Sequence, residues 1–377
     1  MKITGVKTYV VSPGKRNYIY VRIDTDEGIH GIGEAYSVGP DLATAETIKY
    51  FADWLIGQDP TRPEYIWTML FNYSRFPGGS IVNSAISGID FALWDITAKA
   101  LGVPVYKLFG GPSRDKVWIY EDTHAPTAEA LVEEVQQLRS EGYTAMKLFQ
   151  SISGRQSANE TIKAMREKYE KLRSDVGYDF ELGIDFQARN FEPFRALWYA
   201  DAIKEFRPFF IEEPIRPDNF AQMAELKKKL PAPLATGECL YTKYEFNDLI
   251  AMDAADILQP DIMLTGGMTE GKKIAAMAEA NYKVIAPHNP LSPLSTVQNV
   301  HFAASIPNFL ILEHKCDDRP DRRDILNEYL PVKDGYIELP TRPGWGVDLN
   351  YEYLDSLSYA PWHRTFALRV DGSIDMA

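Results

Sequence analysis

Three acidic residues recur at nearly even spacing in the middle of the chain, and this spacing constrains the fold more than any other feature. Glu212 follows Asp185 by 27 residues, and Glu238 follows Glu212 by 26. Each acid ends, or nearly ends, a short apolar run, and stretches of helical length separate the runs. A strand, a helix and two short loops need about that many residues, which predicts parallel strands joined by helices. If the strands are neighbours, the three carboxylates meet at one mouth of a sheet or barrel.

The acidic residues also indicate which metal the site would hold. Three carboxylates form a hard, all-oxygen ligand set. Mg²⁺ prefers such oxygen ligands, whereas Zn²⁺ is usually bound through sulfur and nitrogen. The sequence therefore predicts Mg²⁺ as the cofactor.

The charge balance and the cysteine content limit the class of protein. The 377 residues carry a formal net charge of −13, which argues against a surface that binds nucleic acid or an anionic membrane. Two cysteines are too few for a disulfide scaffold and fit a reducing compartment. The first residues alternate as a strand does rather than forming a signal peptide, and no run approaches a membrane span. We therefore expect a cytoplasmic protein with no nucleic-acid or membrane partner.

Two glycine-rich stretches resemble nucleotide-binding loops but are incomplete. Gly31 and Gly33 are followed by Tyr36 where a dinucleotide-binding loop needs a third glycine, so we interpret them as a bend in a strand. Residues 266–272 nearly match a phosphate loop, but Lys273 stands where a serine or threonine must reach Mg²⁺. The sequence therefore argues against nucleotide binding.

The rhythm of apolar residues divides the chain into three segments. Residues 1–112 are predicted to form an α+β cap, with antiparallel strands up to about residue 35 and helices over 43–56, 63–73 and 80–101. Residues 113–318 repeat strand and then helix, which predicts an α/β barrel. Residues 319–377 lose this rhythm, and we expect them to pack on the cap. The eight strand-like runs of the barrel are 117–120, 144–149, 182–184, 208–211, 233–237, 255–261, 283–287 and 309–312.

The later strand-like runs also end in polar residues. Asp261, His288 and Glu313 each lie about one strand–helix unit beyond the preceding acid, and Lys147 lies inside the second run. On adjacent strands Asp261 would orient His288, fix its tautomer and raise its basicity. Taken alone, a histidine here is more often structural, and a carboxylate at a strand end often caps the next helix. Six such residues in register favour a functional site.

Several longer motifs resemble the mandelate racemase subgroup of the enolase superfamily, and within it D-galactonate dehydratase and related acid-sugar dehydratases. The resemblance covers nearly the whole chain and implies a modified TIM barrel of the (β/α)7β kind with an α+β cap. It also implies a homo-oligomer, a dimer or an octamer. The motifs that carry the resemblance are 56–60, 84–90, 92–95, 210–214, 265–270 and 286–288.

The resemblance implies a role for each polar residue of the site. The Mg²⁺ ligands would be Asp185, Glu212 and Glu238. His288 would be the base that removes the α-proton of a sugar acid, with Asp261 as its partner, as in other enolase-type sites. Glu313 would stabilise the enediolate oxygen, and Lys147 would lie near the substrate carboxylate. Glu213, which follows the ligand Glu212, should point away because side chains alternate along a strand.

Two positions depart from the family pattern. Phe149 stands where the subgroup's Lys-x-Lys motif has its second lysine. Gln187 stands where galactonate dehydratases have a histidine that acts as the general acid. Neither side chain can give a proton to a leaving hydroxide. One face of the substrate therefore lacks an evident acid or base. This predicts syn dehydration, in which His288 takes the α-proton and returns it to the leaving group.

Three further residues are candidates for binding the substrate. Gln187 can donate a hydrogen bond, and Arg189 can bind a hydroxyl or a carboxylate, with a surface ion pair as the alternative. His124, just after the first barrel strand, could supply the missing acid or a substrate contact, and a structural role is equally compatible with its position. We expect the loops 12–17 and 76–79 to act as lids that set specificity.

The predicted function is that of a Mg²⁺-dependent lyase that dehydrates an aldonate or aldarate, galactonate-like or gluconate-like, to a 2-keto-3-deoxy acid. Racemisation is disfavoured because it usually needs a base on each face. One alternative is cycloisomerisation or ether elimination on an anhydro-sugar or lactone acid. Another is a catalytically weak homologue that binds sugar acids. The intact pair of Asp261 and His288 argues against the last, because binding does not require a poised base.

Overall fold

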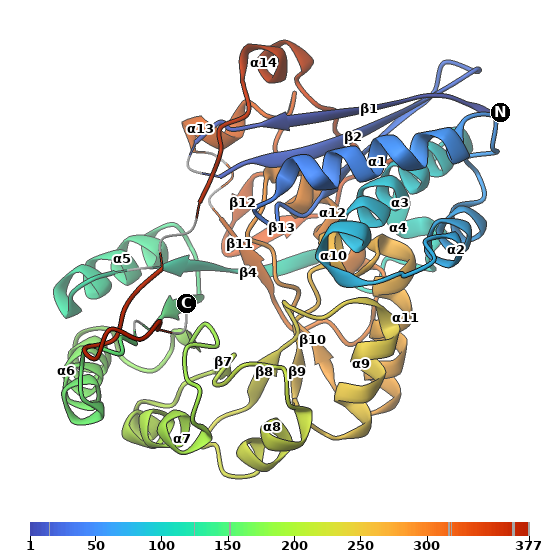
Figure 1. Ribbon diagram of the computed structural model, residues 1–377. Helices are drawn as coiled ribbons and strands as arrows, with labels where there is room; N and C mark the ends of the chain where they lie inside the picture. The colour runs from blue at the N-terminus through green and yellow to red at the C-terminus, as the bar shows by residue number, and fades with distance from the viewer. Residues whose placement is uncertain are drawn as a thin grey trace.

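The computed structural model describes residues 1–14, 16–123, 125–150, 152–315, 317, 319–363 and 366–375. An antiparallel sheet with helices against it forms the cap, and a ring of parallel strands with helices outside it forms the barrel (Figure 1). Among the described residues, none of the helices combines the length and hydrophobicity needed to cross a bilayer.

The cap begins with three antiparallel strands, β1 (Ile3–Val11), β2 (Tyr18–Thr25) and β3 (His30–Ala35). Its helices are α1 (Asp41–Leu55), α2 (Pro63–Tyr73), α3 (Gly79–Leu101) and the short α4 (Val105–Leu108). The antiparallel strands and the three longer helices confirm the predicted secondary structure within one or two residues at each end.

Gly31 and Gly33 bring β3 against the backbone of α3. A Cβ atom at Gly31 would lie 2.0 Å from the carbonyl oxygen of Ala92, and one at Gly33 would lie 2.1 Å from that of Gly88. No side chain fits in this space, so these glycines serve close packing. Both glycines lie inside β3, and the bend at this pair stays a prediction.

In the part of the chain that the structure describes, the barrel has eight parallel strands, as the apolar runs predicted. Neighbouring strands pair in chain order, and β11 pairs with β4. A parallel bridge between Ile285 and Phe309 closes the gap between β10 and β11. The strands are β4 (Lys116–Thr123), β5 (Ala145–Phe149), β6 (Glu181–Asp185), β7 (Phe210–Glu212), β8 (Leu234–Thr236), β9 (Ile257–Leu258), β10 (Val284–Ile285) and β11 (Leu312–His314).

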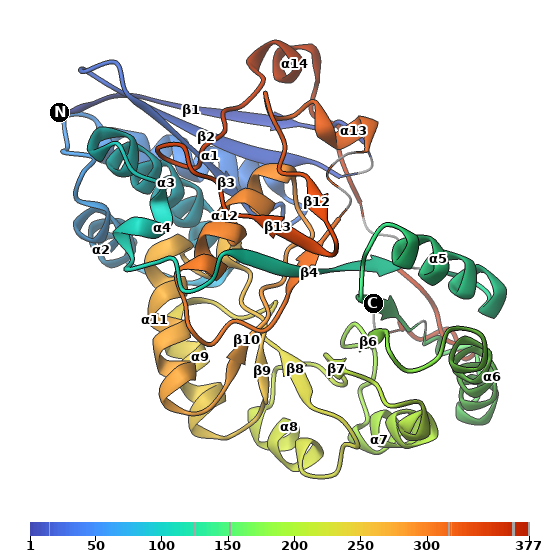
Figure 2. The same cartoon turned by 180° about the vertical axis from the view of Figure 1, so that it is seen from behind.

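Helices connect these strands and cover the outside of the barrel (Figure 2). The helix α6 begins with a complete capping box, in which Ser157 and Glu160 each bond the other's backbone nitrogen. The helices are α5 (Ala128–Ser140), α6 (Ala158–Val176), α7 (Pro193–Ala202), α8 (Phe220–Lys227), α9 (Thr242–Ala251), α10 (Ile262–Thr265), α11 (Gly267–Ala280) and α12 (Pro293–Ala304).

Side chains fill the interior of the barrel, as expected for a TIM-type core. Phe210 on β7 is buried, and a Cβ atom added at Gly183 on β6 would lie 2.4 Å from its ring. The glycine therefore makes room for the aromatic ring. The buried cluster takes residues from most strands or their edges: Tyr120, Ala145, Phe210, Ala235, Ile257, Ala286 and Ile311.

The C-terminal segment first returns to the cap. It forms α13 (Pro320–Arg323), a hairpin of β12 (Val332–Lys333) and β13 (Tyr336–Glu338) that pairs with β4, and α14 (Tyr351–Ser356). Trp345 is fully buried, and its Nε1 donates to the carbonyl of Ile32 over 2.9 Å. Trp345 thus connects this segment to the cap, while the hairpin pairs with the barrel strand β4.

The last described residues, 366–375, leave the cap and lie on the barrel beside α6 (Figures 1 and 2). Gly154 N donates to Asp375 Oδ2 over 2.7 Å, and Arg155 Nε donates to the carbonyl of Leu368 over 3.0 Å. The prediction that the whole segment packs on the cap was therefore wrong for its end. The domain boundaries at 112 and 318 stay predictions.

Candidate active site

The three acids that organise the sequence lie at neighbouring strand ends. Asp185 is the last residue of β6 and pairs in register with Glu212, the last residue of β7. Glu238 follows β8 by two residues. Asp185 and Glu212 are 2% and 1% exposed, whereas the side chain of Glu238 is 28% exposed. The carboxylates therefore gather at the carboxyl end of the barrel strands, where barrel enzymes carry their active sites.

Burial and mutual repulsion make these carboxylates hard to ionise together. Burial raises the pKa of Asp185 well above its usual value, and the charge of Glu212 raises it further. Burial also raises the pKa of Glu212, which Lys147 opposes and Glu238 reinforces. A cation placed among them would relieve this repulsion.

Lys147 on β5 supplies part of that positive charge. Its Nζ donates to Glu212 Oε1 over 2.7 Å and lies 3.5 Å from Glu313 Oε1. Gln259 Nε2 donates to the other oxygen of Glu212 over 2.6 Å. Within the described ranges, the side chains do not already converge as a group of three metal ligands. The donors nevertheless fit a divalent cation that prefers oxygen, since they are buried carboxylates at adjacent strand ends.

His288 and Asp261 form the predicted pair. His288 Nδ1 lies 2.9 Å from Asp261 Oδ2. This leaves Nε2 facing the acids, at 3.4 Å from Glu238 Oε2 and 4.0 Å from Glu313 Oε2. Burial lowers the pKa of His288, but Glu238, Glu313 and Asp261 outweigh it and raise this pKa well above its usual value. His288 therefore holds a basic nitrogen toward the acidic cluster.

Asp261 caps a helix and also contacts His288, so it has both of the roles that the sequence allowed. Its Oδ1 accepts a hydrogen bond from Met263 N over 2.9 Å at the start of α10, while Oδ2 contacts His288. The first bond fixes the carboxylate, and the fixed carboxylate orients the imidazole.

Glu313 on β11 presents its two oxygens to different groups. Oε2 accepts a hydrogen bond from Asn289 N over 2.8 Å on the side of His288. Oε1 is buried and has no hydrogen-bond partner in the part of the chain that the structure describes. It lies 3.5 Å from Lys147 Nζ and 3.6 Å from Lys315 Nζ.

Lys315 is the residue that sequence reasoning missed. It directly follows β11, forms an ion pair with Asp122, and lies with its Nζ 5.2 Å from the centre of the Phe149 ring. The sequence signal that could have pointed to Lys315 is its position just past the last barrel strand, two residues after Glu313.

A turn, rather than strand alternation, sets the direction of Glu213. The strand β7 ends at Glu212, and Glu213 adopts a left-handed backbone with φ of 42°. Its carboxylate accepts hydrogen bonds from Thr236 Oγ1 over 2.7 Å and from Gly237 N over 3.2 Å. The predicted reason was therefore wrong, because the strand does not extend to this residue.

Among the predicted substrate contacts, Gln187 lies beside the acids. It has a φ of 54°, and its backbone N donates to Asp185 Oδ1 over 2.6 Å. This bond holds Asp185 in place. His124 lies outside the described residues.

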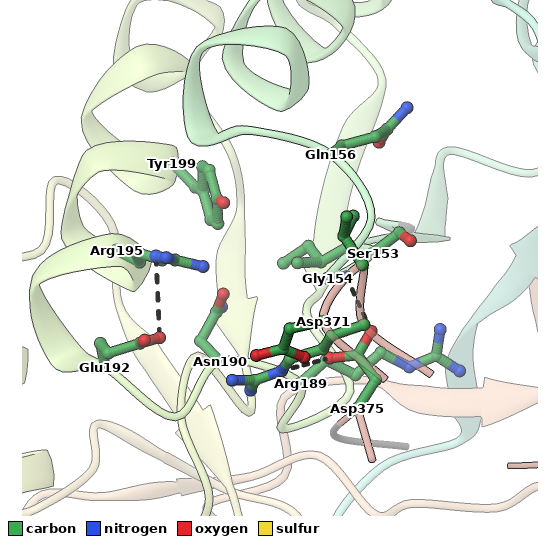
Figure 3. A pocket seen from close by; sticks show the side chains of 13 residues that line it. Ser153, Gly154, Gln156, Arg189, Asn190, Glu192, Arg195, Tyr199, Asp371 and Asp375 are labelled. Atoms are coloured by element: carbon green, nitrogen blue, oxygen red, sulfur yellow. Dashed lines mark hydrogen bonds and ion pairs between the residues drawn. The ribbon is translucent and has the colours of Figure 1, made fainter. Parts of the chain in front are cut away.

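Arg189 lines a pocket of about 320 Å³ between the loops after β5 and β6 and the C-terminal residues (Figure 3). The pocket also contains Arg369 and Asp371 from those C-terminal residues and Arg195 from α7. Arg195 forms an ion pair with Glu192 at 3.8 Å. The role of Arg189 in substrate binding stays a prediction.

From the cap, Tyr36 lies beside the imidazole, and Arg16 lies beside Tyr36. The guanidinium carbon of Arg16 lies 5.1 Å from the centre of the Tyr36 ring, and the Tyr36 ring lies 6.3 Å from that of His288. This places the loop where a lid would lie, and its role in specificity stays a prediction.

Comparisons with known proteins agree with this geometry. Residues 2–110 match the N-terminal domain of the mandelate racemase / muconate lactonizing enzyme family, and residues 130–354 match the enolase C-terminal domain-like family. The chain is 34% identical to D-galactonate dehydratase of Verminephrobacter eiseniae, over 99% of each chain.

Two solved structures share the whole fold. A putative galactarate dehydratase from Agrobacterium radiobacter, bound to sodium and L-malate, is 39% identical with a TM-score of 0.96, over all of both chains. An enolase from Pantoea ananatis with bound D-gluconate and magnesium is 28% identical with a TM-score of 0.92, again over all of both chains. Together these matches show that the chain is a modified TIM barrel with an N-terminal cap, and that it belongs to the mandelate racemase / muconate lactonizing enzyme family of the enolase superfamily.

Proposed function

We propose that this protein is a Mg²⁺-dependent lyase that dehydrates an acid sugar to a 2-keto-3-deoxy acid. The observation that carries the proposal is the histidine of the Asp261–His288 pair, whose free nitrogen faces a cluster of buried carboxylates. The named activity of D-galactonate dehydratases supports the reaction class. The malate and gluconate bound in the two related structures support a hydroxy acid as the substrate.

Asp185, Glu212 and Glu238 would hold the Mg²⁺. When bound, the ion would stabilise the negative charge that develops on the substrate carboxylate as the α-proton leaves. The magnesium in the Pantoea ananatis structure supports this choice of metal, and the oxygen donors of this chain suit it.

His288 would remove the α-proton through Nε2. Asp261 holds Nδ1 and so stabilises the imidazolium that forms. Lys147 lies between Glu212 and Glu313, where its ammonium group would face a substrate carboxylate. Glu313 would bind an oxygen of the substrate next to His288.

A substrate screen tests the reaction. We expect Mg²⁺-dependent release of a 2-keto-3-deoxy acid from at least one member of a panel of aldonates and aldarates that includes D-galactonate, D-gluconate and galactarate. The variant His288→Asn should lose turnover by about 10²–10⁴-fold, as expected for loss of a general base. A folded His288→Asn variant with full turnover would contradict the base assignment. A product isomeric with its substrate would contradict dehydration.

A binding measurement tests the metal ligands without using activity. At about 100 times its dissociation constant, Mg²⁺ should stabilise the folded protein by about 2.7 kcal/mol in thermal or urea unfolding. The variant Glu238→Gln should lose most of this gain. The control Glu225→Gln changes an exposed carboxylate of α8 that is paired with Lys228, and it should keep the stabilisation by Mg²⁺. An equal gain in all three proteins would exclude Glu238 as a ligand.

The cytoplasmic location and the homo-oligomer stay predictions.

A further inference from the structure

The amine of Lys315 lies at the barrel mouth on the side of the first two strands. It forms an ion pair with Asp122 near the end of β4, and it lies 5.2 Å from the centre of the Phe149 ring at the end of β5. Phe149 is the position where the family has a second lysine. A lysine from the far end of the barrel sequence therefore brings an ammonium group to a place where the local sequence carries only a phenyl ring.

Glu313 separates Lys315 from His288. His288 Nε2 lies 4.0 Å from Oε2 of Glu313, whereas Lys315 Nζ lies 3.6 Å from Oε1. The two groups that can carry a proton thus approach opposite oxygens of one carboxylate. The side chain of Lys315 is 20% exposed, so it is not sealed inside the core.

Oε1 of Glu313 provides a second, independent indication of a ligand. It is buried, and the groups around it in the described residues are the ammonium groups of Lys147 and Lys315, which lie 3.5 and 3.6 Å away and leave it without a short hydrogen bond. Buried carboxylate oxygens are normally hydrogen-bonded. A substrate hydroxyl beside Lys315 could donate to Oε1 and accept from Nζ, which would satisfy both.

The surroundings of Lys315 allow it to give up a proton near neutral pH. The pKa of Lys315 is lowered to about 7. Burial is the main cause, nearby arginines add to it, and Glu121 opposes it. The ion pair with Asp122 favours the charged form. The charged and titratable groups that face Lys315 are Asp122 and Glu121 from β4, Lys147 from β5, Glu313 from β11, Arg16 from the loop after β1, and Arg319 and Arg322 from α13 and its N-terminus.

We propose that Lys315 is the general acid of the dehydration, which protonates the leaving hydroxyl on the other side of Glu313 from His288. This inference rests on the proposed function. A purely structural role, in which Lys315 only neutralises Asp122, is the alternative that the experiment must exclude.

The proton balance of the step is complete without another reactant. His288 takes the α-proton, and the electron pair of the C–H bond moves toward the carboxylate. These electrons then form a double bond between the α- and β-carbons as the β C–O bond breaks. The hydroxyl takes a proton from Lys315 Nζ and leaves as water, and the enol product tautomerises to the 2-keto-3-deoxy acid. The syn elimination through His288 alone is then unnecessary, because Lys315 supplies the proton for the leaving group.

Two variants of Lys315 separate proton donation from charge. Lys315→Met removes the amine, and Lys315→Arg keeps a positive charge beside Asp122 but does not release a proton at neutral pH. We expect both to lower dehydration by about 10²–10⁴-fold. In D₂O both should still exchange the substrate's α-hydrogen, since His288 is intact. In contrast, His288→Asn should lose exchange and dehydration together.

A substrate with a better leaving group tests the same step. A 3-deoxy-3-fluoro analogue of the acid sugar that the enzyme dehydrates loses fluoride without needing a proton. Both Lys315 variants should release fluoride at rates within about tenfold of the unaltered enzyme, a gap well below the full contribution of a general acid. In the unaltered enzyme, kcat/KM for the hydroxyl substrate should fall at alkaline pH as Lys315 loses its proton. The pH profile for the fluoro analogue should lack this fall. This last measurement needs no variant to fold.

Several results would overturn the assignment. Full dehydration by Lys315→Met would exclude any catalytic role, and full dehydration by Lys315→Arg would show that charge alone suffices. Loss of α-hydrogen exchange, or of fluoride release, together with dehydration would indicate a structural role or a role as the base. If the unaltered enzyme dehydrates none of the acid sugars in the panel, the proposed function itself fails, and this outcome is distinct from failure of the Lys315 assignment.

Discussion

Single carboxylates in this site make two contacts each, and this double use fixes the geometry. One oxygen of Asp261 caps α10 and the other holds His288. One oxygen of Glu313 accepts from a backbone N–H while the other lies near two ammonium groups. The backbone contacts immobilise the two carboxylates, so the imidazole keeps its position relative to the acids.

We predict that Asp261→Asn impairs proton abstraction while the helix cap survives. Asparagine caps helices as well as aspartate does, so the start of α10 should stay intact. The neutral amide neither stabilises the imidazolium nor fixes the same tautomer. We therefore expect kcat to fall by about 10²–10⁴-fold, with an unchanged midpoint of thermal unfolding. A large loss of stability with normal kcat per folded molecule would indicate that the cap matters more than the pair.

The sequence predicted those site residues whose positions follow from the period of the barrel. Asp185, Glu212 and Glu238 recur once per strand–helix unit, and parallel strands bring such residues to one end. Lys315 has no such regularity in the sequence. Its long side chain reaches across β4 to Phe149, and only the folded chain shows where its amine ends.

At the scale of secondary-structure elements, buried acids connect the cap to the barrel. Glu34 on β3 accepts hydrogen bonds at the start of α12 from Ser292 N over 3.3 Å and from Ser295 N over 3.0 Å. Asp90 on α3 accepts from the backbone N of Thr269 on α11 over 3.0 Å. The cap is thus hydrogen-bonded to the helices that flank His288 in the sequence.

We predict that this connection weakens as the pH rises. Burial raises the pKa of Glu34 to about 8, above its usual value of 4.5. The folded protein therefore holds a proton that the unfolded chain releases in this range. Stability from this group is complete below pH 4.5 and is lost as the pH rises to about 8.

The variant Glu34→Gln, which cannot ionise, tests this prediction. Between pH 5 and 9 its free energy of unfolding should fall less than that of the unaltered protein, as measured by urea unfolding. Parallel pH dependences in the two proteins would show that Glu34 does not carry the effect.

Elements with strong periodic signals were predicted, and so were the short strands β9 and β10 of the strand–helix repeat, whereas the short strands outside this repeat were not. The amphipathic runs of α2 and α6 have clear starts, with Pro63 at the first turn of one and the capping box at Ser157 of the other. In contrast, β12 has two residues and β13 has three, which is too short for a period to show. They form because β13 pairs with the first residues of β4, and β12 then pairs with β13.

Across the whole molecule, the two ends of the chain contact different halves of the barrel. The N-terminal cap bonds the helices α11 and α12, which follow the late strands. The C-terminal residues bond the loop after β5 and line a pocket with the loop after β6. The sequence could not reveal the second contact, since it depends on residues more than 200 positions apart.

We predict that Asp375 holds the loop after β5 in place. Asp375→Asn weakens the bonds to Gly154 and Arg369, and the loss of a charged acceptor should cost about 1–3 kcal/mol locally. Amide hydrogens of residues 152–156 should exchange faster, and KM for the acid sugar should rise with little change in the unfolding midpoint. The matched control is Asp371→Asn, whose carboxylate bonds Ser373 within its own turn. If both variants behave alike, the contact with the loop is not responsible.

The division between the two ends of the chain has an evolutionary consequence. Substitutions in the C-terminal residues can reshape the wall formed by the loops after β5 and β6 while the bonds between the cap and α12 stay as they are. Relatives could therefore diverge in the size and charge of this pocket through the tail alone, and keep the pair of Asp261 and His288 unaltered.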